Sequence, residues 1–579
     1  MRTSPLLLSL ALLAACARPG GPTRTTAVPA RTPAGPWPAT WEMAGRAVPV
    51  SAAQAMVVTG HPLATEVGRA ILERGGNAID AAVAVAFALT AVLPAAGNIG
   101  GGGFIVYRDS SGSVSALDYR EAAPLAAWRD MYLDATGNPT EQSLTGRLAS
   151  GVPGSVAGLY EAWRRYGRLD WAVLVAPAVT LAEGHVIDAS RSHSIAADAE
   201  RLGRFPASRA QFLVDGRAPA AGSPFHQPDL ARTLRLIADS GPDVFYRGQI
   251  ADLIVAEMLR GHGLITRADL AAYHPKWREP VRITYRGYTV YSMPPASSGG
   301  VTLGQVLNIL EGYDSLPPFG STALLHLETE AMRRAFTDRN RWLGDPDFVQ
   351  MPLERLLSKS YAAQLRAQID PARATPTPRF DPGPPAGANT THYSIVDADG
   401  NAASVTTTLN NGFGSAVTVT GGGFLLNDEM DDFATAPGKP NLFGLVQGEA
   451  NAVAPGKRMP SAMTPSIVLD PEGHLYLVLG APGGPRIITA VYHVISNVID
   501  HHMNLAAAVE APRLHHQALP DTISLERGGY HPAMEDSLRA MGHAVRERGY
   551  SALVMAIGRG PAGWIGVADP RSGGSANGY

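Results

Sequence analysis

The sequence predicts an α+β fold in which the two halves of the chain differ in character. Residues 150–380 have the spacing of helices joined by loops, whereas the chain after residue 390 alternates in short steps typical of strands. A proline- and glycine-rich stretch, RFDPGPPAGAN (residues 379–389), lies between them and is typical of an exposed connector. The chain therefore has a natural joint just before Thr390.

The composition excludes several classes of protein. The chain has 579 residues, 45% of them hydrophobic, which is enough for a large buried core. Its formal net charge is −3 and no block of like charges occurs, so neither nucleic acid nor an anionic membrane surface is expected as a partner. No uninterrupted run of 18 apolar residues follows the N-terminus, which predicts no membrane-spanning helix in the body.

The N-terminus reads as an export signal. MRTSPLLLSLALLAACARPG has a basic residue, a short apolar run and small residues ending at Cys16, which predicts a lipoprotein-type signal peptide over residues 1–16. LAAC resembles the lipobox of bacterial lipoproteins, whose cysteine is lipidated; an ordinary signal peptide cut after Ala15 or Ala17 is the alternative. We therefore expect a periplasmic protein anchored to the outer membrane through a lipid. Residues 17–48 are rich in proline and alanine and predict a tether.

Two helices are expected at the start of the body, in HPLATEVGRAILERGGNAIDAAVAVAFAL (residues 61–89). The apolar face of the first is expected to comprise Leu63, Val67, Ala70 and Ile71. A glycine pair at 75–76 ends that helix, and Asn77 can cap a second one that runs through Ala88. The glycine run at 100–103 leads directly into a strand, and without Gly-Lys-Ser/Thr or a following helix it predicts close backbone packing, not a phosphate loop.

A hairpin is predicted around DADGN (residues 397–401), which joins THYSIV to AASVTTTL. A turn centred on Asp399 places Thr390 opposite Thr408, with Cβ atoms about 5 Å apart. Taken locally, the pair can be ordinary β-branched strand residues. A cut before Thr390 would change that, because a free α-amino group, with a pKa of about 7.7–8.0, can act as base for the threonine hydroxyl.

With these motifs in place, the chain closely resembles the γ-glutamyltranspeptidases. The resemblance extends from about Met56 to Tyr579 and includes ALDYREAAP, LASGVPGSVAG, YSMPPASSGG, TTHYSIVD, LLNDEMDDF, GAPGGPRI and APRLHHQ in order. It implies a four-layer αββα sandwich of the N-terminal nucleophile hydrolase type. It also implies a precursor that cleaves itself between Asn389 and Thr390, into an associated large subunit (residues 49–389) and small catalytic subunit (residues 390–579).

The resemblance assigns the chemistry as well. Thr390 is the implied nucleophile, Thr408 its support, and the N–H groups of Gly483 and Gly484 the oxyanion hole, where one donor can be worth about 2.7–4 kcal/mol. The implied substrate is a γ-glutamyl amide such as glutathione, whose γ-glutamyl group passes to water, an amino acid or a dipeptide. No cofactor and no metal are implied.

Other residues are implied to hold the charged ends of the substrate. Arg120 in DYRE matches the family arginine that pairs with the α-carboxylate, a task suited to a guanidinium fork. Ser461 matches a serine that binds the same carboxylate. The positions that hold the α-ammonium are Asn410, Glu429 and Asp432.

Two positions depart from the family pattern. Members commonly carry two adjacent serines for the carboxylate, but here Ser461 is followed by Ala462, and the missing hydroxyl could cost on the order of 1 kcal/mol. Residues 437–450 match the lid loop, whose aromatic residue is often tyrosine and is Phe443 here. The ring can cover the pocket without donating a hydrogen bond, which can shift the balance of hydrolysis against transfer.

Three alternatives follow from the same residues. An acylase on this fold would take glutaryl or cephalosporin-type side chains that lack the α-amino group. The missing serine favours this alternative, whereas Glu429, Asp432 and the lid loop disfavour it. A surface-anchored binding protein with a dead site would leave the chain uncut. A metal loop at DEMDD is the third; the paired histidines at 501–502 and 515–516 are interpreted as structural, because adjacent residues do not share a helix face and no cysteine completes a site.

Overall fold

The computed structural model describes residues 36–376, 390–550 and 552–579, and these described residues form one compact unit. The predicted signal peptide, Cys16 and Asn389 lie outside the described residues. Residues 36–48 correct the predicted tether, because they pack on the body. Trp41 is buried, and its indole N–H donates to the carbonyl of Glu510 at 2.9 Å. The folded body thus begins before residue 49.

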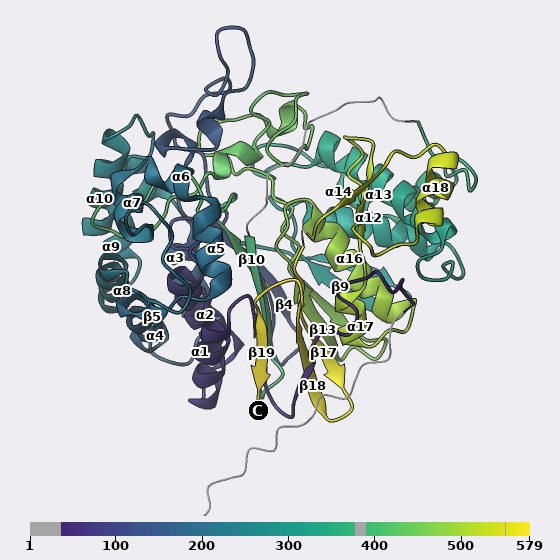
Figure 1. Cartoon of the computed structure of the whole chain (residues 1–579), viewed down its shortest axis with the longest axis horizontal. Coiled ribbons are helices and arrows are strands. Elements are labelled where there is room, and N and C mark those ends of the chain that lie inside the picture. Colours follow the sequence, from purple (N-terminus) through teal and green to yellow (C-terminus); the bar gives the residue numbers. More distant parts are fainter. Residues whose placement is uncertain (1–35, 377–389, 551) are drawn as a thin grey trace, which may run out of the picture. The chain divides into compact units, whose positions relative to one another are not determined.

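Two seven-stranded sheets form the centre of this unit (Figure 1). The first has the order β19 (Ser575–Gly578), β2 (Met56–Thr59), β10 (Thr390–Val396), β11 (Ala402–Thr408), β3 (Gly102–Arg108), β4 (Val114–Asp118) and β7 (Lys276–Arg278). The second has the order β1 (Val50–Ala52), β18 (Gly563–Ala568), β17 (Met555–Gly560), β13 (Leu475–Gly480), β12 (Ser466–Leu469), β9 (Tyr288–Ser292) and β8 (Val281–Tyr285).

The two sheets pack face to face, with β10 and β11 against β13 and β17. Small hydroxyl side chains bridge them: Ser404 donates to the carbonyl of Leu479 and Ser394 to that of Met555, both at 3.0 Å. Because each bridge satisfies a buried polar group, the sheets can approach closely. Both faces of β10 and β11 are covered, so their residues are almost all buried and do not alternate with solvent.

Helices cover the outer face of each sheet, which gives the predicted αββα sandwich. Over the first sheet lie α1 (Pro62–Glu73), α2 (Ala78–Val92), α3 (Ser155–Tyr166) and α4 (Trp171–Glu183), with α5 (Ala189–Ala197), α6 (Ala199–Gly203), α7 (Pro206–Phe212), α8 (Pro228–Ser240), α9 (Asp243–Tyr246), α10 (Gln249–Leu259) and α11 (Arg267–Ala272) on that side. Over the second lie α12 (Gly299–Glu311), α13 (Thr322–Trp342), α14 (Leu353–Leu356), α15 (Lys359–Arg366), α16 (Arg486–Ile499), α17 (Leu505–Glu510) and α18 (Pro532–Ala540). Two small sheets complete the fold, β14 (Leu514–His515), β15 (Ile523–Glu526) and β16 (Val545–Arg548), and β5 (His185–Val186) with β6 (Pro224–Phe225).

The opening helices confirm the predicted cap at Asn77, but α2 ends at Val92, not at Ala88, and the predicted face of α1 is only partly correct. Asn77 caps α2 through a capping box with Asp80, and every residue of α2 is buried. The buried side of α1 is formed by Ala64, Gly68 and Ile71, whereas Ala70 is exposed. A Cβ on Gly68 would lie 2.8 Å from Val85, so α1 turns its smallest residues toward α2. Among the described helices, none is long and apolar enough to cross a membrane.

Candidate active site

The hairpin pairs Thr390 with Thr408, as predicted. They are Cα partners at the open end of β10 and β11, and their hydroxyl oxygens lie 3.2 Å apart. The Thr408 hydroxyl also accepts the backbone N–H of Asn410 at 2.8 Å. Because one lone pair of the Thr408 oxygen is occupied by this N–H, the Thr408 hydroxyl proton points away from Asn410 and can be donated to Thr390. Thr390 is half-buried and Thr408 buried.

The glycine run at 100–103 holds this end of the hairpin in place. The Asn98 amide donates to the carbonyl of Thr408 at 2.8 Å and accepts the N–H of Gly101 at 3.0 Å. A Cβ on Gly101 would lie 2.2 Å from the Thr408 carbonyl oxygen, so only glycine fits there. The run is therefore a close-packing device, as expected.

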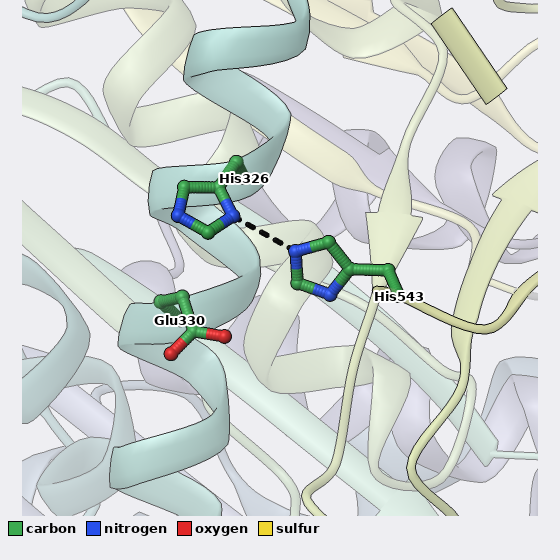
Figure 2. A group of neighbouring side chains, drawn as sticks. All are labelled: His326, Glu330 and His543. Atoms are coloured by element: carbon green, nitrogen blue, oxygen red, sulfur yellow. Dashed lines mark hydrogen bonds between the residues drawn. The ribbon is translucent and has the colours of Figure 1, made fainter. Parts of the chain in front are cut away.

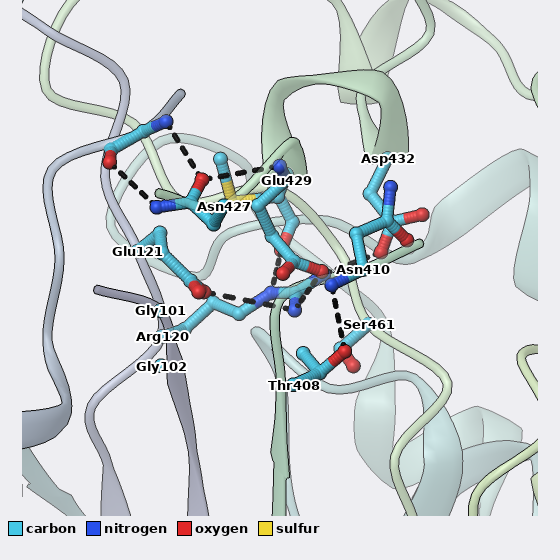
Figure 3. Close-up of polar contacts among 12 residues, drawn as sticks. Gly101, Gly102, Arg120, Glu121, Thr408, Asn410, Asn427, Glu429, Asp432 and Ser461 are labelled. Carbon is cyan, nitrogen blue, oxygen red and sulfur yellow. Dashed lines mark hydrogen bonds and ion pairs between the residues drawn. The ribbon is translucent and has the colours of Figure 1, made fainter. Parts of the chain in front are cut away.

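A buried ion cluster lies beside Thr408 (Figure 3), in the pocket that Thr390 also lines. The Arg120 guanidinium donates to Glu429 Oε1 at 2.5 Å and also to Asp432, while its Nε donates to the carbonyl of Met459 at 3.3 Å. Glu121 approaches the same guanidinium at 3.7 Å. One arginine thus faces three carboxylates, so the residues implied to bind opposite ends of a substrate are paired with one another here.

Burial shapes the protonation of this cluster. It raises the pKa of Glu121 to about 7, and neither Glu121 carboxylate oxygen has a hydrogen-bond partner within the described residues. It also raises the pKa of Glu429 and of Asp432, with Arg120 opposing the rise. For Arg120 itself burial lowers the pKa, but the carboxylates of Glu429 and Asp432 outweigh that effect and raise it.

A short 3₁₀ turn, η3 (Glu429–Asp432), presents two of these acids. Asn427 holds the turn: its Oδ1 accepts the N–H of Glu429 at 3.1 Å, and its amide donates to the carbonyls of Gly100 and Gly151. The Asn410 amide donates to the carbonyl of Asp428 at 3.0 Å, which leaves Asn410 Oδ1 as an acceptor beside the cluster.

A second cation, Arg339 of α13, lines the same pocket and was missed by the sequence analysis. Its Nε donates to Ser298 Oγ at 2.9 Å, and Ser298 Oγ donates to the carbonyl of Ser461 at 2.5 Å. Burial lowers the pKa of Arg339 to about 10, which leaves it charged at neutral pH. It lies on the side of Ser461 and Ala462, where the family's second serine hydroxyl is missing.

Gly483 and Gly484 precede the N-terminus of α16, where backbone N–H groups and the helix dipole favour an anion. Both glycines have positive φ, +139° and +58°, and no acceptor for their N–H groups is found among the described residues. A Cβ on Gly484 would lie 2.9 Å from the ring of Phe443. The predicted lid residue therefore lies directly against the predicted oxyanion hole.

One pocket of about 320 Å³ collects most of the predicted site. Its lining includes Thr390, Thr408, Arg120, Asn410, Glu429, Asp432, Ser461, Phe443 and Gly484, together with Arg339 and Ala462. Gly483 is next to this lining without being part of it.

A different cluster, His326, Glu330 and His543, has ligand atoms within 4.8 Å of one another and is buried (Figure 2). Most of its polar atoms are already engaged, although His543 Nδ1 has no hydrogen-bond partner among the described residues. His326 Nδ1 and His543 Nε2 share a hydrogen bond of 2.8 Å, and His326 Nε2 donates to the carbonyl of Asp370. Glu330 is bound by arginine side chains and by the N–H of Thr375 at 3.1 Å. These contacts explain the cluster as a structural link between α13 and residues 370–375.

Asp431 of DEMDD and the histidine pair at 515–516 are engaged as well, whereas His501 Nε2 is buried without a hydrogen-bond partner among the described residues. Asp431 accepts from Ser143 Oγ at 2.8 Å and from the N–H of Leu442 at 3.0 Å. His515 is held between Thr489 and Gln517, and His516 by Asp521.

The αββα sandwich has a threonine, Thr390, at the start of a central strand, and the N-terminus of α16 lies at the pocket that this threonine lines. This arrangement defines the class of N-terminal nucleophile hydrolases. Comparison with known proteins narrows the class. The family model described as gamma-glutamyltranspeptidase matches residues 64–579. The glutathione hydrolase proenzyme of Escherichia coli (strain K12) is 46% identical over 532 residues, covering 90% of this chain and 91% of its own.

Acylases are also similar. The acylase ACY 1 proenzyme of Pseudomonas sp. (strain SE83) is 40% identical over 509 residues, covering 86% of this chain and 88% of its own. The crystal structure of cephalosporin acylase from Bacillus halodurans superposes with a TM-score of 0.82 at 30% identity, over 92% of this chain and 97% of that one. The chain belongs to the γ-glutamyltranspeptidase family, and it is an enzyme made as a precursor of two associated subunits.

Proposed function

We propose that this enzyme is a self-processing γ-glutamyl transferase and hydrolase that cleaves γ-glutamyl amides such as glutathione. The observation that carries the proposal is the pocket in which the Thr390 hydroxyl and the Arg120, Glu429 and Asp432 cluster meet. A γ-glutamyl group presents an α-ammonium and an α-carboxylate on one carbon. A pocket with acids and a guanidinium in contact offers a partner to each.

Processing comes first. Cleavage between Asn389 and Thr390 would yield a large subunit ending at residue 389 and a small subunit comprising residues 390–579. Thr390 then carries a free α-amino group, which takes the proton of its own hydroxyl. The order of strands in the first sheet supports association after the cut, because β10 and β11 lie between β2 and β3 of the large subunit.

The reaction then proceeds in two steps. The Thr390 oxygen attacks the γ-carbonyl carbon, and the N–H groups of Gly483 and Gly484 stabilise the oxyanion. The amine leaves with the proton taken from the hydroxyl, and a γ-glutamyl ester of Thr390 remains. Water or the amine of an amino acid or dipeptide attacks this ester, gives up a proton through the α-amino group and regenerates the hydroxyl. We expect ping-pong kinetics; a requirement for donor and acceptor to bind before any amine leaves would contradict this mechanism.

In the substrate complex, Asn410, Glu429 and Asp432 hold the ammonium, and Arg120 and Ser461 hold the carboxylate. Ion pairs between Arg120 and the enzyme's own acids are thereby replaced by ion pairs with the substrate. Each buried charge keeps a partner, which limits the desolvation penalty. Arg339 compensates for Ala462 by adding positive charge on the carboxylate side.

Acylase activity on side chains without the α-amino group is the second candidate, and the likeness to the Bacillus halodurans acylase together with Ala462 favours it. Initial rates on γ-glutamyl and glutaryl anilides, which differ only in the α-amino group, separate the two. We expect a preference for the γ-glutamyl anilide of at least about tenfold, because its α-ammonium can form a buried, charged hydrogen bond that the glutaryl anilide cannot form. Preference for glutaryl would identify an acylase, and an uncut, inactive chain on a denaturing gel would identify a binding protein.

Export and lipidation at Cys16 belong to the proposal as well. From the predicted lipobox we infer a location in the bacterial periplasm, with attachment to the outer membrane through a lipid on Cys16. Cys16→Ala should move the enzyme from the outer-membrane fraction into the soluble periplasmic fraction or leave it unprocessed. Unchanged fractionation with the membrane would contradict the lipid anchor.

A further inference from the structure

Two arginines line a pocket that adjoins the active site across Phe443. This pocket, of about 330 Å³, is formed by the lid at Phe443 and Gly444, by Arg486, and by Arg548 at the end of β16. A neighbouring pocket of about 320 Å³ shares both arginines. Phe443 also lines the pocket of Thr390, so its side chain separates the nucleophile from the arginines.

Neither guanidinium has a partner within the described residues. Arg486 and Arg548 make no side-chain hydrogen bond or ion pair there, and Arg548 Nε is buried without an acceptor. Nearby arginines behave differently: Arg513 binds Asp569 at 2.8 Å, and Arg571 binds Glu526 at 2.8 Å. Buried arginines in this region are otherwise paired, as expected from the cost of burying a charge alone.

The surroundings concentrate positive charge further. Arg486 is the first residue of α16, whose N-terminus adds the positive end of the helix dipole. Among the described residues, no carboxylate lines the pocket next to Phe443, and His515 is held neutral by burial, which keeps its pKa well below the usual range. Burial and the neighbouring Arg548 lower the pKa of Arg486 to about 10. Arg486 is therefore charged at neutral pH, and neither guanidinium has an ion-pair partner among the described residues.

This pocket lies close to the predicted oxyanion hole, because Phe443 lines it and also contacts Gly484. Arg486 follows Gly484 by two residues, so the oxyanion hole and the arginine belong to one turn. The lid is fixed on the same side, because Gln517 Nε2 donates to the carbonyl of Phe443 at 3.1 Å. A group attached to the γ-carbonyl and directed away from the Arg120 cluster would extend past Phe443 toward Arg486 and Arg548.

We propose that Arg486 and Arg548 form an anion subsite that binds the carboxylate of the peptide or amino acid on the far side of the scissile bond. The inference rests on the proposed γ-glutamyl transfer. It predicts that the enzyme distinguishes leaving groups and acceptors by a terminal carboxylate, which a guanidinium pair can bind in a bidentate manner.

The test compares glutathione with its C-terminal carboxamide in the wild type, Arg486→Gln, Arg548→Gln and the double variant. For the wild type we expect the KM of glutathione to be about 10- to 100-fold lower than that of its carboxamide. In the double variant the two KM values should lie within about threefold of each other. Arg527→Gln removes an exposed arginine next to the same small sheet and is the matched control, which should keep the wild-type preference. Arg486→Lys keeps the positive charge and should retain part of the preference for the carboxylate.

Glycylglycine and glycylglycinamide as acceptors, with one γ-glutamyl anilide as donor, separate an acceptor role from a leaving-group role. Preference for the carboxylate in either arm, lost in the double variant, supports the subsite. An equal ratio of carboxylate to carboxamide KM in wild type and double variant would overturn it. Absence of turnover of every γ-glutamyl compound by the wild type would instead overturn the proposed function, so the two failures are distinct.

Discussion

Thr390 and Thr408 are opposite each other on neighbouring strands of the first sheet, with their hydroxyl oxygens 3.2 Å apart. Thr408 is itself fixed, by the N–H of Asn410 at its hydroxyl and by Asn98 at its carbonyl. The nucleophile is therefore oriented by a rigid hydrogen-bond chain that ends in backbone. Since a misplacement of about 1 Å can cost about 100-fold in rate, this chain should matter for both self-cleavage and turnover.

We first predict that Thr408→Val slows self-cleavage and lowers kcat on the order of 100-fold, because it removes the hydroxyl while keeping the β-branched shape. Thr408→Ser should recover most of the activity. Densitometry of the two subunits on a denaturing gel and initial rates on a γ-glutamyl anilide measure both effects. Thr390→Ala sets the baseline of an uncut, inactive chain, and valine and serine variants of equal activity would refute the orienting role.

The second prediction concerns the ammonium clamp. Asp432→Asn removes a carboxylate that pairs with Arg120, and we expect kcat/KM for the γ-glutamyl anilide to fall about 10- to 100-fold. The glutaryl anilide lacks the ammonium, so its kcat/KM should change by less than about threefold and serves as the internal control. Equal losses on both substrates would mean that Asp432 acts through the structure of the cluster and not through the substrate.

The third prediction is a pH dependence of stability from Glu121. Its folded pKa of about 7 lies above the unfolded value of about 4.3, so the folded state holds the proton more tightly. Stability therefore falls as pH rises from about 4.3 to 7. Glu121→Gln removes this loss, and its free energy of unfolding relative to wild type should improve on the order of 2 kcal/mol between pH 4 and pH 8.

Urea unfolding at pH 4 and pH 8 gives the difference in free energy of unfolding between Glu121→Gln and wild type at each pH. Any effect of the substitution that does not depend on pH cancels when the two differences are compared. Glu472→Gln, at an exposed turn, is the matched control and should show no such change. A difference between Glu121→Gln and wild type that stays constant with pH would show that Glu121 has the same pKa in both states.

The local parts of the site could be predicted from sequence, because one hairpin contains them. The Asp-Gly turn fixes the register, and the register alone places Thr390 opposite Thr408. Long-range pairing carries no such signal: β19 at the C-terminus pairs with β2, with Ser575 opposite Thr59, and no local pattern indicates this partner. The same applies to Trp41, which lies in a proline-rich segment yet packs against residue 510.

Arg339 was missed for a related reason. It is one of four arginines in MRRAFTDRNRW, and helical spacing does not tell which of them faces a pocket formed by distant loops. The buried pairing of Arg120 with Glu429 and Asp432 was likewise beyond the sequence, since the motifs gave each residue a role toward a substrate and none toward one another. Tertiary contacts decide both: Arg339 binds Ser298, 41 residues away in the chain, and Arg120 pairs with acids 309 and 312 residues away.

The last prediction concerns Phe443, whose ring lies against Gly484 and separates the pocket of Thr390 from the arginine-lined pocket. Phe443→Ala should admit water to the γ-glutamyl ester and raise the ratio of hydrolysis to transfer several-fold. Phe443→Tyr keeps the ring and is the matched control, which should stay at or below the wild-type ratio. The free glutamate and γ-glutamyl-glycylglycine formed at one acceptor concentration give this ratio directly.

The ratio isolates the lid from the oxyanion hole. Both products arise from the same ester, so any damage to acylation through Gly484 lowers their sum and cancels in their ratio. A fall in total rate with an unchanged ratio would mean that Phe443 supports the oxyanion hole without excluding water. A raised ratio in Phe443→Ala alone would show that the ring, and not a phenol hydroxyl, protects the ester in this enzyme.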